Sequence, residues 1–321
     1  MKSFILKITI LLCLLSNVVT AQNYSYVDEK VKTYPKSFTT VDKLAERISK
    51  DFTREDEKAR AIFTWIASNI RYDLAILGTV QRQVGFSYRT EEERLAKKQK
   101  IKNDLANKTL RSRKGVCQGY STLFAVVAEK VGLEAVIIAG ASKSHPSHIG
   151  KYPDYNDHAW NAVKINGDWK LLDATWGAGA VEGNTRKFQF LFNDSYFFAK
   201  PKDFFNNHYP EDEKWLLLNA TKQDFTVLPL YYGGYYSNNY QLITPKNGIL
   251  DNNQKYISFK IRNIKPTDKV AYVFTSSRMF TPLESTFTNN IAEFKISLVN
   301  KISDILTIYV NGESVISYKI K

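Results

Sequence analysis

The chain has 321 residues, an apolar fraction of 44% and a formal net charge of +13 at pH 7. This composition excludes a disordered chain, because it is apolar enough for real cores, and the length favours about two domains. Two cysteines exclude a disulfide framework. The lysines are scattered, without an Arg-rich arm or recognition motif, so we expect no specific nucleic-acid partner, although the positive charge could attract an acidic surface partner.

The first 21 residues are predicted to be a cleaved export signal. Lys2 and Lys7 form a basic head, residues 8–15 are nearly all apolar, and Val19-Thr20-Ala21 matches a cleavage site that ends at Ala21. The apolar run is too short to cross a bilayer, and no later run is long and apolar enough, so we expect no transmembrane segment. The mature chain is therefore expected to be secreted or periplasmic, and monomeric.

Residues 22–230 are predicted to form one core domain that begins with helices. A helix with one buried face is indicated by apolar residues at Ala59, Ile62, Phe63, Ile66 and Ile70. Residues 91–107 read as a strongly charged helix with few apolar anchors. We therefore interpret 78–110 as a solvent-facing insertion in this domain.

The middle of this domain is predicted to contain a helix and three strands. The helix runs from Gly115 to a C-cap at Gly132, with one apolar stripe. The strands are expected at 133–139, 158–165 and 169–175, and Asn166-Gly167 is a strong hairpin signal between the last two. A two-residue turn pairs position 165 with 168, which makes positions 158 and 173 diagonal neighbours on one face. A shift by one residue would place them on opposite faces.

The last third of the chain changes in composition. Residues 186–230 form an aromatic extension of the core, and residues 231–241 form a linker rich in Gly, Tyr and Asn. Residues 242–321 are predicted to be a small all-β, Ig-like sandwich. Its β-type runs are Tyr256–Ile261, Lys269–Thr275, Ile291–Ile296, Ile305–Val310 and Ser314–Ile320.

Cys117 is the candidate nucleophile. It would be the only cysteine left after removal of the signal, which contains Cys13. The start of a helix stabilises a thiolate, and His158 could act as its base with Asp173 orienting the ring. The backbone N–H of Cys117 is a ready oxyanion donor. For a free cysteine the alternative is an inert buried thiol that only packs.

Three segments resemble the transglutaminase-like cysteine enzymes, a branch of the papain-type fold. They are RKGVCQGYS at 113–121, DHAWN at 157–161 and WKLLDATW at 169–176. The resemblance implies an α+β core whose antiparallel sheet packs on the nucleophile helix. It assigns Cys117 as nucleophile, His158 as general base and acid, and Asp173 as orienter. Residues 58–73 also look like the helix that precedes the nucleophile in this family, and residues 196–217 are similar to the extension of kyphoscoliosis-peptidase-like proteins.

The resemblance implies acyl transfer at amide bonds of a protein or peptide substrate, through a thioester. With water the enzyme is a peptidase or amidase, and with a lysine amine it is a crosslinking transglutaminase. We favour hydrolysis, because exported bacterial members need no special acceptor site. The alternative from another class is a non-catalytic adhesion or scaffolding module with a degenerate core.

For other residues near the three motifs the sequence gives less evidence of a role. Trp160 and Gln118 are candidate substrate-binding residues, whereas the register places Trp176 off the catalytic face. His208 is interpreted as structural. The acidic clusters that bind calcium in animal transglutaminases are not apparent, and we expect neither a metal nor a cofactor.

Overall fold

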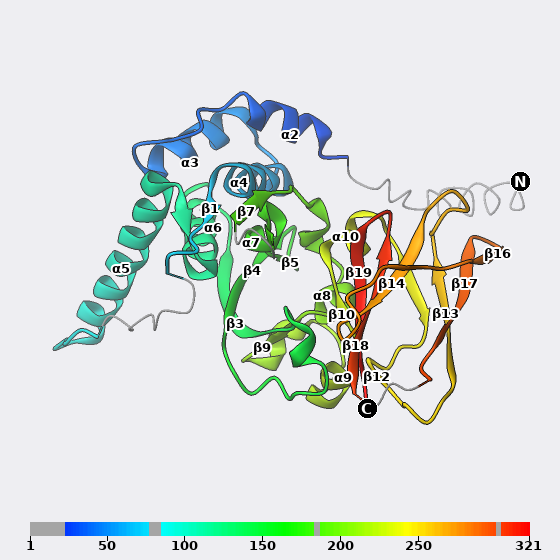
Figure 1. Cartoon of the computed structure of the whole chain (residues 1–321). Helices are drawn as coiled ribbons and strands as arrows, with labels where there is room; N and C mark the ends of the chain where they lie inside the picture. Colours follow the sequence, from blue (N-terminus) through cyan, green and yellow to red (C-terminus); the bar gives the residue numbers. More distant parts are fainter. Residues whose placement is uncertain (1–22, 77–84, 183–186, 300–302) are drawn as a thin grey trace, which may run out of the picture.

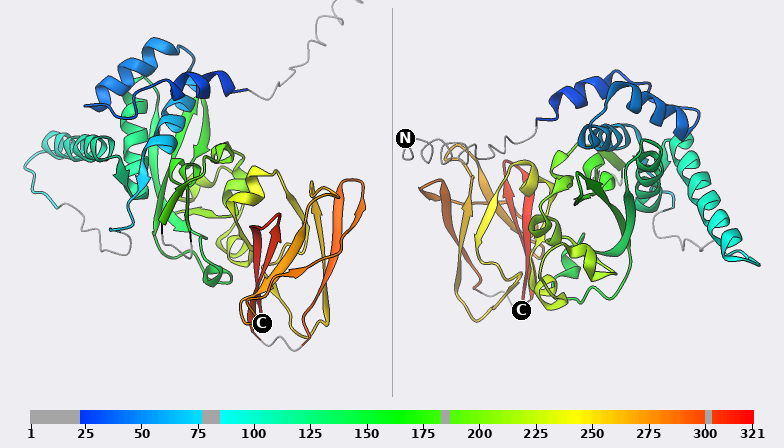
Figure 2. Two further views of the ribbon diagram at one scale, coloured as in Figure 1. Left: turned by 45° about the horizontal axis from the view of Figure 1, so that its top comes forward. Right: turned by 180° about the vertical axis from the view of Figure 1, so that it is seen from behind.

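The computed structural model describes residues 23–76, 85–182, 187–299 and 303–321 (Figure 1). The predicted export signal lies outside these ranges. An N-terminal lobe of helices and sheet lies beside a C-terminal β-sandwich, and the further views show the same two lobes (Figure 2). Within the described ranges, no helix combines the length and the apolar character needed to span a membrane.

A five-stranded antiparallel sheet forms the centre of the N-terminal lobe, as expected for the α+β core. Its strand order is β8–β5–β4–β3–β9. The bounds are β3 Ala135–Ser142, β4 His158–Ile165, β5 Asp168–Leu172, β8 Phe197–Ala199 and β9 His208–Pro210. Val163 and Leu172 belong to the main core with the helices. Trp160 and Leu171 pack on the opposite face, against Phe204 of the short helix α8 Pro201–Phe205.

Helices surround the main core on the other side of the sheet (Figure 1). They are α2 Ser25–Lys32, α3 Val41–Asp51, α4 Glu55–Asn69, α5 Glu91–Ser112 and α6 Cys117–Lys130. α6 is buried on every side from Gly119 to Ala128, because α3, α4, α5 and the sheet all contact it. The apolar stripe predicted for this helix is thus only one part of its buried surface.

The C-terminal end of α5 packs on the beginning of α6. Ala106, Thr109 and Leu110 are buried, so the interpretation of 78–110 as solvent-facing is wrong for the last turns of this helix. A Cβ atom at Gly119 would lie 2.8 Å from the Thr109 hydroxyl, and one at Gly115 would lie 3.1 Å from the Thr109 methyl. The absence of side chains at these two glycines therefore allows the two helices to approach closely.

The predicted hairpin register is confirmed. Ile165 pairs with Asp168 and Asn161 with Leu172, and Asn166 and Gly167 both have positive φ, as a tight hairpin turn requires. However, β5 ends at Leu172, earlier than predicted. Asp173 instead caps the short helix α7 Ala174–Ala178, so the three outermost predicted pairs do not form.

The C-terminal lobe is an Ig-like β-sandwich. One sheet has the order β10–β19–β18–β14–β15 with β12 also paired to β19, and the other has the order β11–β13–β17–β16. The five predicted runs are confirmed to within one residue at each end, as β13 Tyr256–Arg262, β14 Val270–Phe274, β17 Ile291–Ser297, β18 Asp304–Val310 and β19 Glu313–Ile320. The additional short strands are β11 Gln241–Thr244, β12 Ile249–Leu250, β15 Thr281–Pro282 and β16 Thr286–Thr288.

The segment predicted to be a linker is folded against both lobes. β10 Leu230–Tyr231 pairs with β19, and α10 Gly233–Ser237 follows it. Tyr231 and Tyr235 are buried in the core of the sandwich. Tyr236 donates a hydrogen bond to Asn207 of the N-terminal lobe. The glycines of residues 231–241 are typical of a linker. The tyrosines of the same segment, however, bury apolar area in the core of the sandwich and so hold the segment against it.

Candidate active site

Cys117 is the first residue of α6, and the start of this helix favours an anion. The N-cap residue is Val116, which offers no side-chain acceptor to the first amides, and the first turn holds no acidic residue. The positive end of the helix dipole is therefore not compensated locally. Cys117 is the free cysteine of the described chain and is partly exposed, so an electrophile can reach it.

His158, the first residue of β4, is placed beside this thiol. The Cys117 sulfur is close enough to this ring to raise its pKa, and Nε2 of the ring lies 2.7 Å from Asp173 Oδ2. Because Nε2 is used by the carboxylate, Nδ1 is the nitrogen left for the sulfur. β4 is fixed to α6 through the buried Asn161 amide, which donates to the carbonyl oxygens of Ser121 and Val136 at 3.0 Å each.

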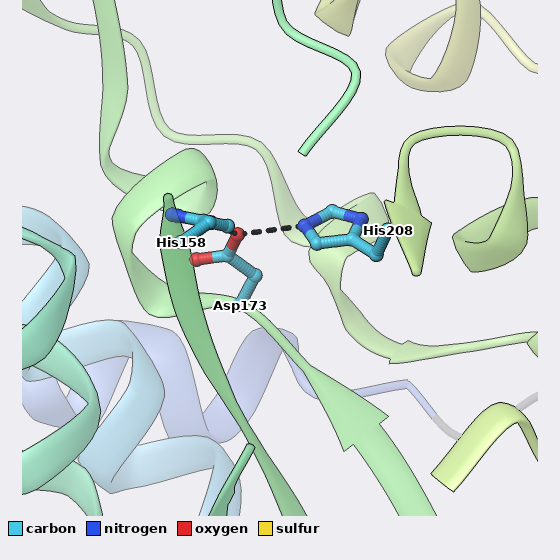
Figure 3. A group of neighbouring side chains, drawn as sticks. All are labelled: His158, Asp173 and His208. Atoms are coloured by element: carbon cyan, nitrogen blue, oxygen red, sulfur yellow. Dashed lines mark hydrogen bonds and ion pairs between the residues drawn. The ribbon is translucent and has the colours of Figure 1, made fainter. Parts of the chain in front are cut away.

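The Asp173 carboxylate is fully buried and accepts four hydrogen bonds. Oδ1 accepts from the backbone N–H groups of Thr175 at 2.8 Å and Trp176 at 3.1 Å. Oδ2 accepts from His158 and, at 3.0 Å, from Nε2 of His208 (Figure 3). Asp173 therefore caps α7 and also contacts the imidazole that faces the thiol.

His158 and Asp173 each stabilise the charged form of the other. Burial alone would lower the pKa of His158, but the Asp173 carboxylate and the Cys117 sulfur outweigh it and raise the pKa to about 10. Burial would raise the pKa of Asp173, but the two imidazoles bring it well below its usual range. At neutral pH His158 is thus a cation beside an anionic Asp173, which is the charge state that stabilises a neighbouring thiolate.

We predict a pH-dependent contribution of His158 to stability. Its folded pKa lies above the ordinary value of 6.5, so the stabilisation is complete below pH 6.5 and is lost as the pH rises toward 10. Urea unfolding of the native chain and of His158→Gln at pH 6.5 and pH 9 isolates the effect. The difference in free energy of unfolding should shrink by about 1 kcal/mol per pH unit. A difference that does not change with pH would contradict this assignment.

The structure shows the surroundings of the two candidate substrate-binding residues, whose role stays a prediction. Trp160 is 1% exposed and packs against Phe204, so its environment is that of a core residue and it offers no surface to a substrate. Gln118 donates to the Thr122 hydroxyl at 3.2 Å, and its side chain therefore follows the helix. Neither position gives structural support for substrate contact.

Trp176 was predicted to lie off the catalytic face, and this is wrong. Its ring centroid is 5.4 Å from that of His158 and 4.6 Å from that of His208. The reason is that the chain turns into α7 at Asp173, which breaks the strand alternation used in the prediction. Tyr72, at the end of β1 Arg71–Tyr72, is also near the thiol: burial and the charge of Cys117 raise its pKa.

His158, Asp173 and His208 also bring three possible metal ligands within 4.8 Å of one another, and no other such group of three occurs in the described ranges. A zinc ion with bonds of about 2.0–2.1 Å to nitrogen would space tetrahedral ligand atoms about 3.3 Å apart. The Oδ2–Nε2 distances of 2.7 and 3.0 Å are shorter than that. These two distances match hydrogen bonds, so the three side chains form a hydrogen-bonded group.

Comparison with known proteins agrees with this geometry. Residues 42–174 match the model of the transglutaminase-like superfamily. This segment contains Cys117, His158 and Asp173, the residues that the structure brings together. The part of the chain that carries the site is therefore similar to the transglutaminase-like superfamily.

Several animal proteins share this transglutaminase-like core. The chain is 33% identical to kyphoscoliosis peptidase of Homo sapiens over 194 residues, which are 59% of this chain and 26% of that protein. It is 26% identical to hillarin of Drosophila melanogaster over 229 residues, 62% of this chain and 25% of that protein. The chain thus spans about a quarter of the length of these relatives. A crystal structure of a TGase aligns at 20% identity over 58% of this chain and 40% of that one, with a TM-score of 0.29.

Proposed function

We propose that the chain is an exported cysteine enzyme of the transglutaminase-like superfamily that hydrolyses amide bonds of proteins or peptides. The observation that carries this proposal is the connected group of Cys117, His158 and Asp173, with the thiol at an uncapped helix start. The likeness to a peptidase supports hydrolysis in particular. A degenerate binding module would have no reason to keep a buried imidazolium–carboxylate pair beside a reachable thiol.

The chemistry that we propose has two stages. The Cys117 thiolate attacks the amide carbonyl carbon, and the backbone N–H of Cys117 donates to the oxygen as negative charge develops there. His158 gives its proton to the amide nitrogen, the C–N bond breaks, and a thioester remains. Neutral His158 then takes a proton from water, the hydroxide attacks the thioester, and the acid leaves as the thiolate–imidazolium pair forms again.

An apolar strip near the thiol supports a peptide substrate. Phe190, Leu191 and Phe192 are 40%, 62% and 43% exposed, at the end of β7 Lys187–Phe190, which lies beside β1 (Figure 1). β1 ends in Tyr72. Burial and the charge of Cys117 raise the pKa of this tyrosine. Exposed apolar side chains grouped next to a reactive group are typical of a binding surface for side chains of another polypeptide.

The deciding experiment is intact-mass labelling with iodoacetamide at pH 6. An ordinary thiol is less than about 1% ionised at that pH, so a thiolate held by His158 should react about 100-fold faster. The same chain unfolded in urea supplies the reference thiol, and His158→Ala should fall to that rate. Any preparation that retains the N-terminal residues should carry Cys13→Ala in all arms. Native labelling no faster than the unfolded reference would refute the proposal.

Crosslinking is the alternative outcome of the same thioester. A peptide panel incubated with and without a primary amine separates the two reactions. Cleaved peptides, whether or not the amine is present, indicate hydrolysis, whereas incorporation of the amine into an intact glutamine peptide indicates transamidation. Cys117→Ala must abolish either product. The N-terminal residue of the exported protein, which we propose is Gln22, can be read from the same mass spectra.

A further inference from the structure

A second imidazole contacts the catalytic carboxylate. His208 begins β9, is 2% exposed, and places Nε2 3.0 Å from Asp173 Oδ2, the same oxygen that contacts His158 (Figure 3). The three motifs around Cys117, His158 and Asp173 do not include it. Its contact with Asp173 connects it to the group that faces the thiol.

The hydrogen bonds at Asp173 fix the direction of this contact. An ionised carboxylate only accepts hydrogen bonds, so both imidazoles must present Nε2–H to Oδ2. Oδ1 is already occupied by the two backbone N–H groups of α7. The backbone therefore holds one oxygen of the carboxylate, whereas the two rings are what holds the other oxygen among the residues that the structure describes.

The surroundings of His208 favour a neutral ring in a fixed orientation. The ring stacks on Phe204 with a centroid distance of 3.9 Å, and Trp176 and Trp160 lie 4.6 and 5.0 Å away. This aromatic enclosure removes water, and burial lowers the pKa of His208. Nε2 faces the Asp173 carboxylate at 3.0 Å, and Nδ1 faces the Phe204 carbonyl oxygen at 3.3 Å. Because the carboxylate is the closer and the stronger acceptor, the one N–H of a neutral ring is assigned to Nε2.

Neighbouring residues fix the backbone on which His208 is carried. Asn207 is buried, and its amide donates to the carbonyl oxygens of Lys143 at 2.6 Å and Tyr231 at 3.0 Å. Its side-chain oxygen accepts from the Tyr236 hydroxyl at 2.6 Å. The position of His208 is thus determined by both the central sheet and the segment that leads into the sandwich.

We propose that His208 is a positioning residue for the thiol chemistry: a neutral imidazole that donates Nε2–H to Asp173 Oδ2 and holds this oxygen in line with His158. The inference deepens the proposed function and rests on it. Cys117, His158 and Asp173 act on the substrate or on one another, and His208 acts through Asp173 alone.

The donor should change how tightly His158 holds its proton. A hydrogen bond from His208 withdraws negative charge from Oδ2 without adding a cation. Without it the carboxylate becomes more basic toward His158, and the imidazolium gives its proton to the leaving amine less readily. The other titratable side chains around Asp173 are Cys117 and the hydroxyls of Tyr72, Tyr120 and Tyr196, and burial raises the pKa of all three tyrosines.

Two substitutions of similar length separate this role from packing. His208→Gln keeps a neutral N–H donor near the position of Nε2, whereas His208→Met fills the space without a donor. In the full chain we expect His208→Gln to hydrolyse peptide within about threefold of native, and His208→Met to lose about 10- to 100-fold in kcat, the range for a hydrogen bond to a charged group. If His208→Met does not fold, as judged by circular dichroism, His208→Asn replaces it, because its shorter amide cannot reach Oδ2.

A second measurement does not depend on activity. The chain contains only four histidines, so their ring resonances can be assigned one by one by substitution. In a Cys117→Ala background, His158 should titrate at higher pH in His208→Met, by up to about one unit, and at an unchanged pH in His208→Gln. An equal His158 titration in all three chains, or a loss of activity in His208→Gln as large as in His208→Met, would overturn the proposal. If the native thiol is not activated, the proposed function fails while this titration still decides the role of His208.

Discussion

Asp173→Asn is expected to reduce amide hydrolysis roughly 10³- to 10⁴-fold, the range seen when the acid of such a triad is replaced by its amide. The asparagine oxygen can still accept from the backbone of α7, so the helix keeps its cap. Its NH₂ group then faces Nε2 of His158 and Nε2 of His208, which in the native chain donate hydrogen bonds to the carboxylate oxygen. His158 must turn Nε2 into an acceptor and carry its proton on Nδ1, which removes the base that faces the thiol.

The matched control for this change is Asp157→Asn. Asp157 directly precedes His158, and its carboxylate accepts only from the backbone N–H and the hydroxyl of Ser142 among the contacts described. It therefore loses the same charge without altering the contacts of the His158 ring. We expect Asp157→Asn to keep activity within about tenfold of native, and iodoacetamide labelling at pH 6 to fall to the unfolded reference only in Asp173→Asn. Equal effects of the two substitutions would mean that net charge, not the contact with His158, is what matters.

Gly140→Ala is the second substitution for which we expect a large effect. Gly140 pairs with His158 on one side and with Pro210 of β9 on the other. A Cβ atom here would lie 2.2 Å from the Tyr209 carbonyl oxygen and 2.5 Å from the Trp160 ring. Because the first neighbour is backbone, β9 must move, and His208 moves with it. We expect the free energy of unfolding to fall by about 3 kcal/mol, the upper end for overpacking a buried site, and labelling of Cys117 to slow.

Gly85→Ala is the control, because it is the same replacement of glycine by alanine at a position with open space around it. Nothing lies within 4 Å of a Cβ atom at this position, so its free energy of unfolding should stay within about 0.5 kcal/mol of native. Both variants can be measured by urea unfolding at pH 6.5. If Gly140→Ala were as stable as Gly85→Ala, β3 and β9 would have to be less closely packed than the structure shows.

The parts of the site that sequence could predict depend on local rules. A two-residue Asn-Gly turn fixes the register of its own hairpin, and this register alone predicts that His158 lies near Asp173. The five long strands of the sandwich followed from β-type runs between turn signals. The helix start at Cys117 followed from the glycines and the apolar spacing around it.

The parts that were missed depend on contacts between distant segments or on a change of element. The end of β5 at Leu172 could have been anticipated, because an Asp that begins Asp-Ala-Thr-Trp is a good N-cap, and this would have moved Trp176 toward His158. No local signal could have placed His208, which lies 35 residues after Asp173 and reaches it only when β9 pairs with β3. Nor does a run of glycine and tyrosine reveal that it packs between two lobes.

The pairing of β10 with β19 limits how this protein can be divided. Asn207, whose neighbour is His208, bonds to the carbonyl oxygen of Tyr231, and Tyr231 lies in a strand that is completed by residues near position 316. A fragment cut just before the sandwich would keep every residue of the family motif and yet leave Tyr231 and Tyr235 without the apolar surface that covers them. Anyone preparing a minimal catalytic unit for crystals or assays should therefore carry the expression boundary beyond Ile320.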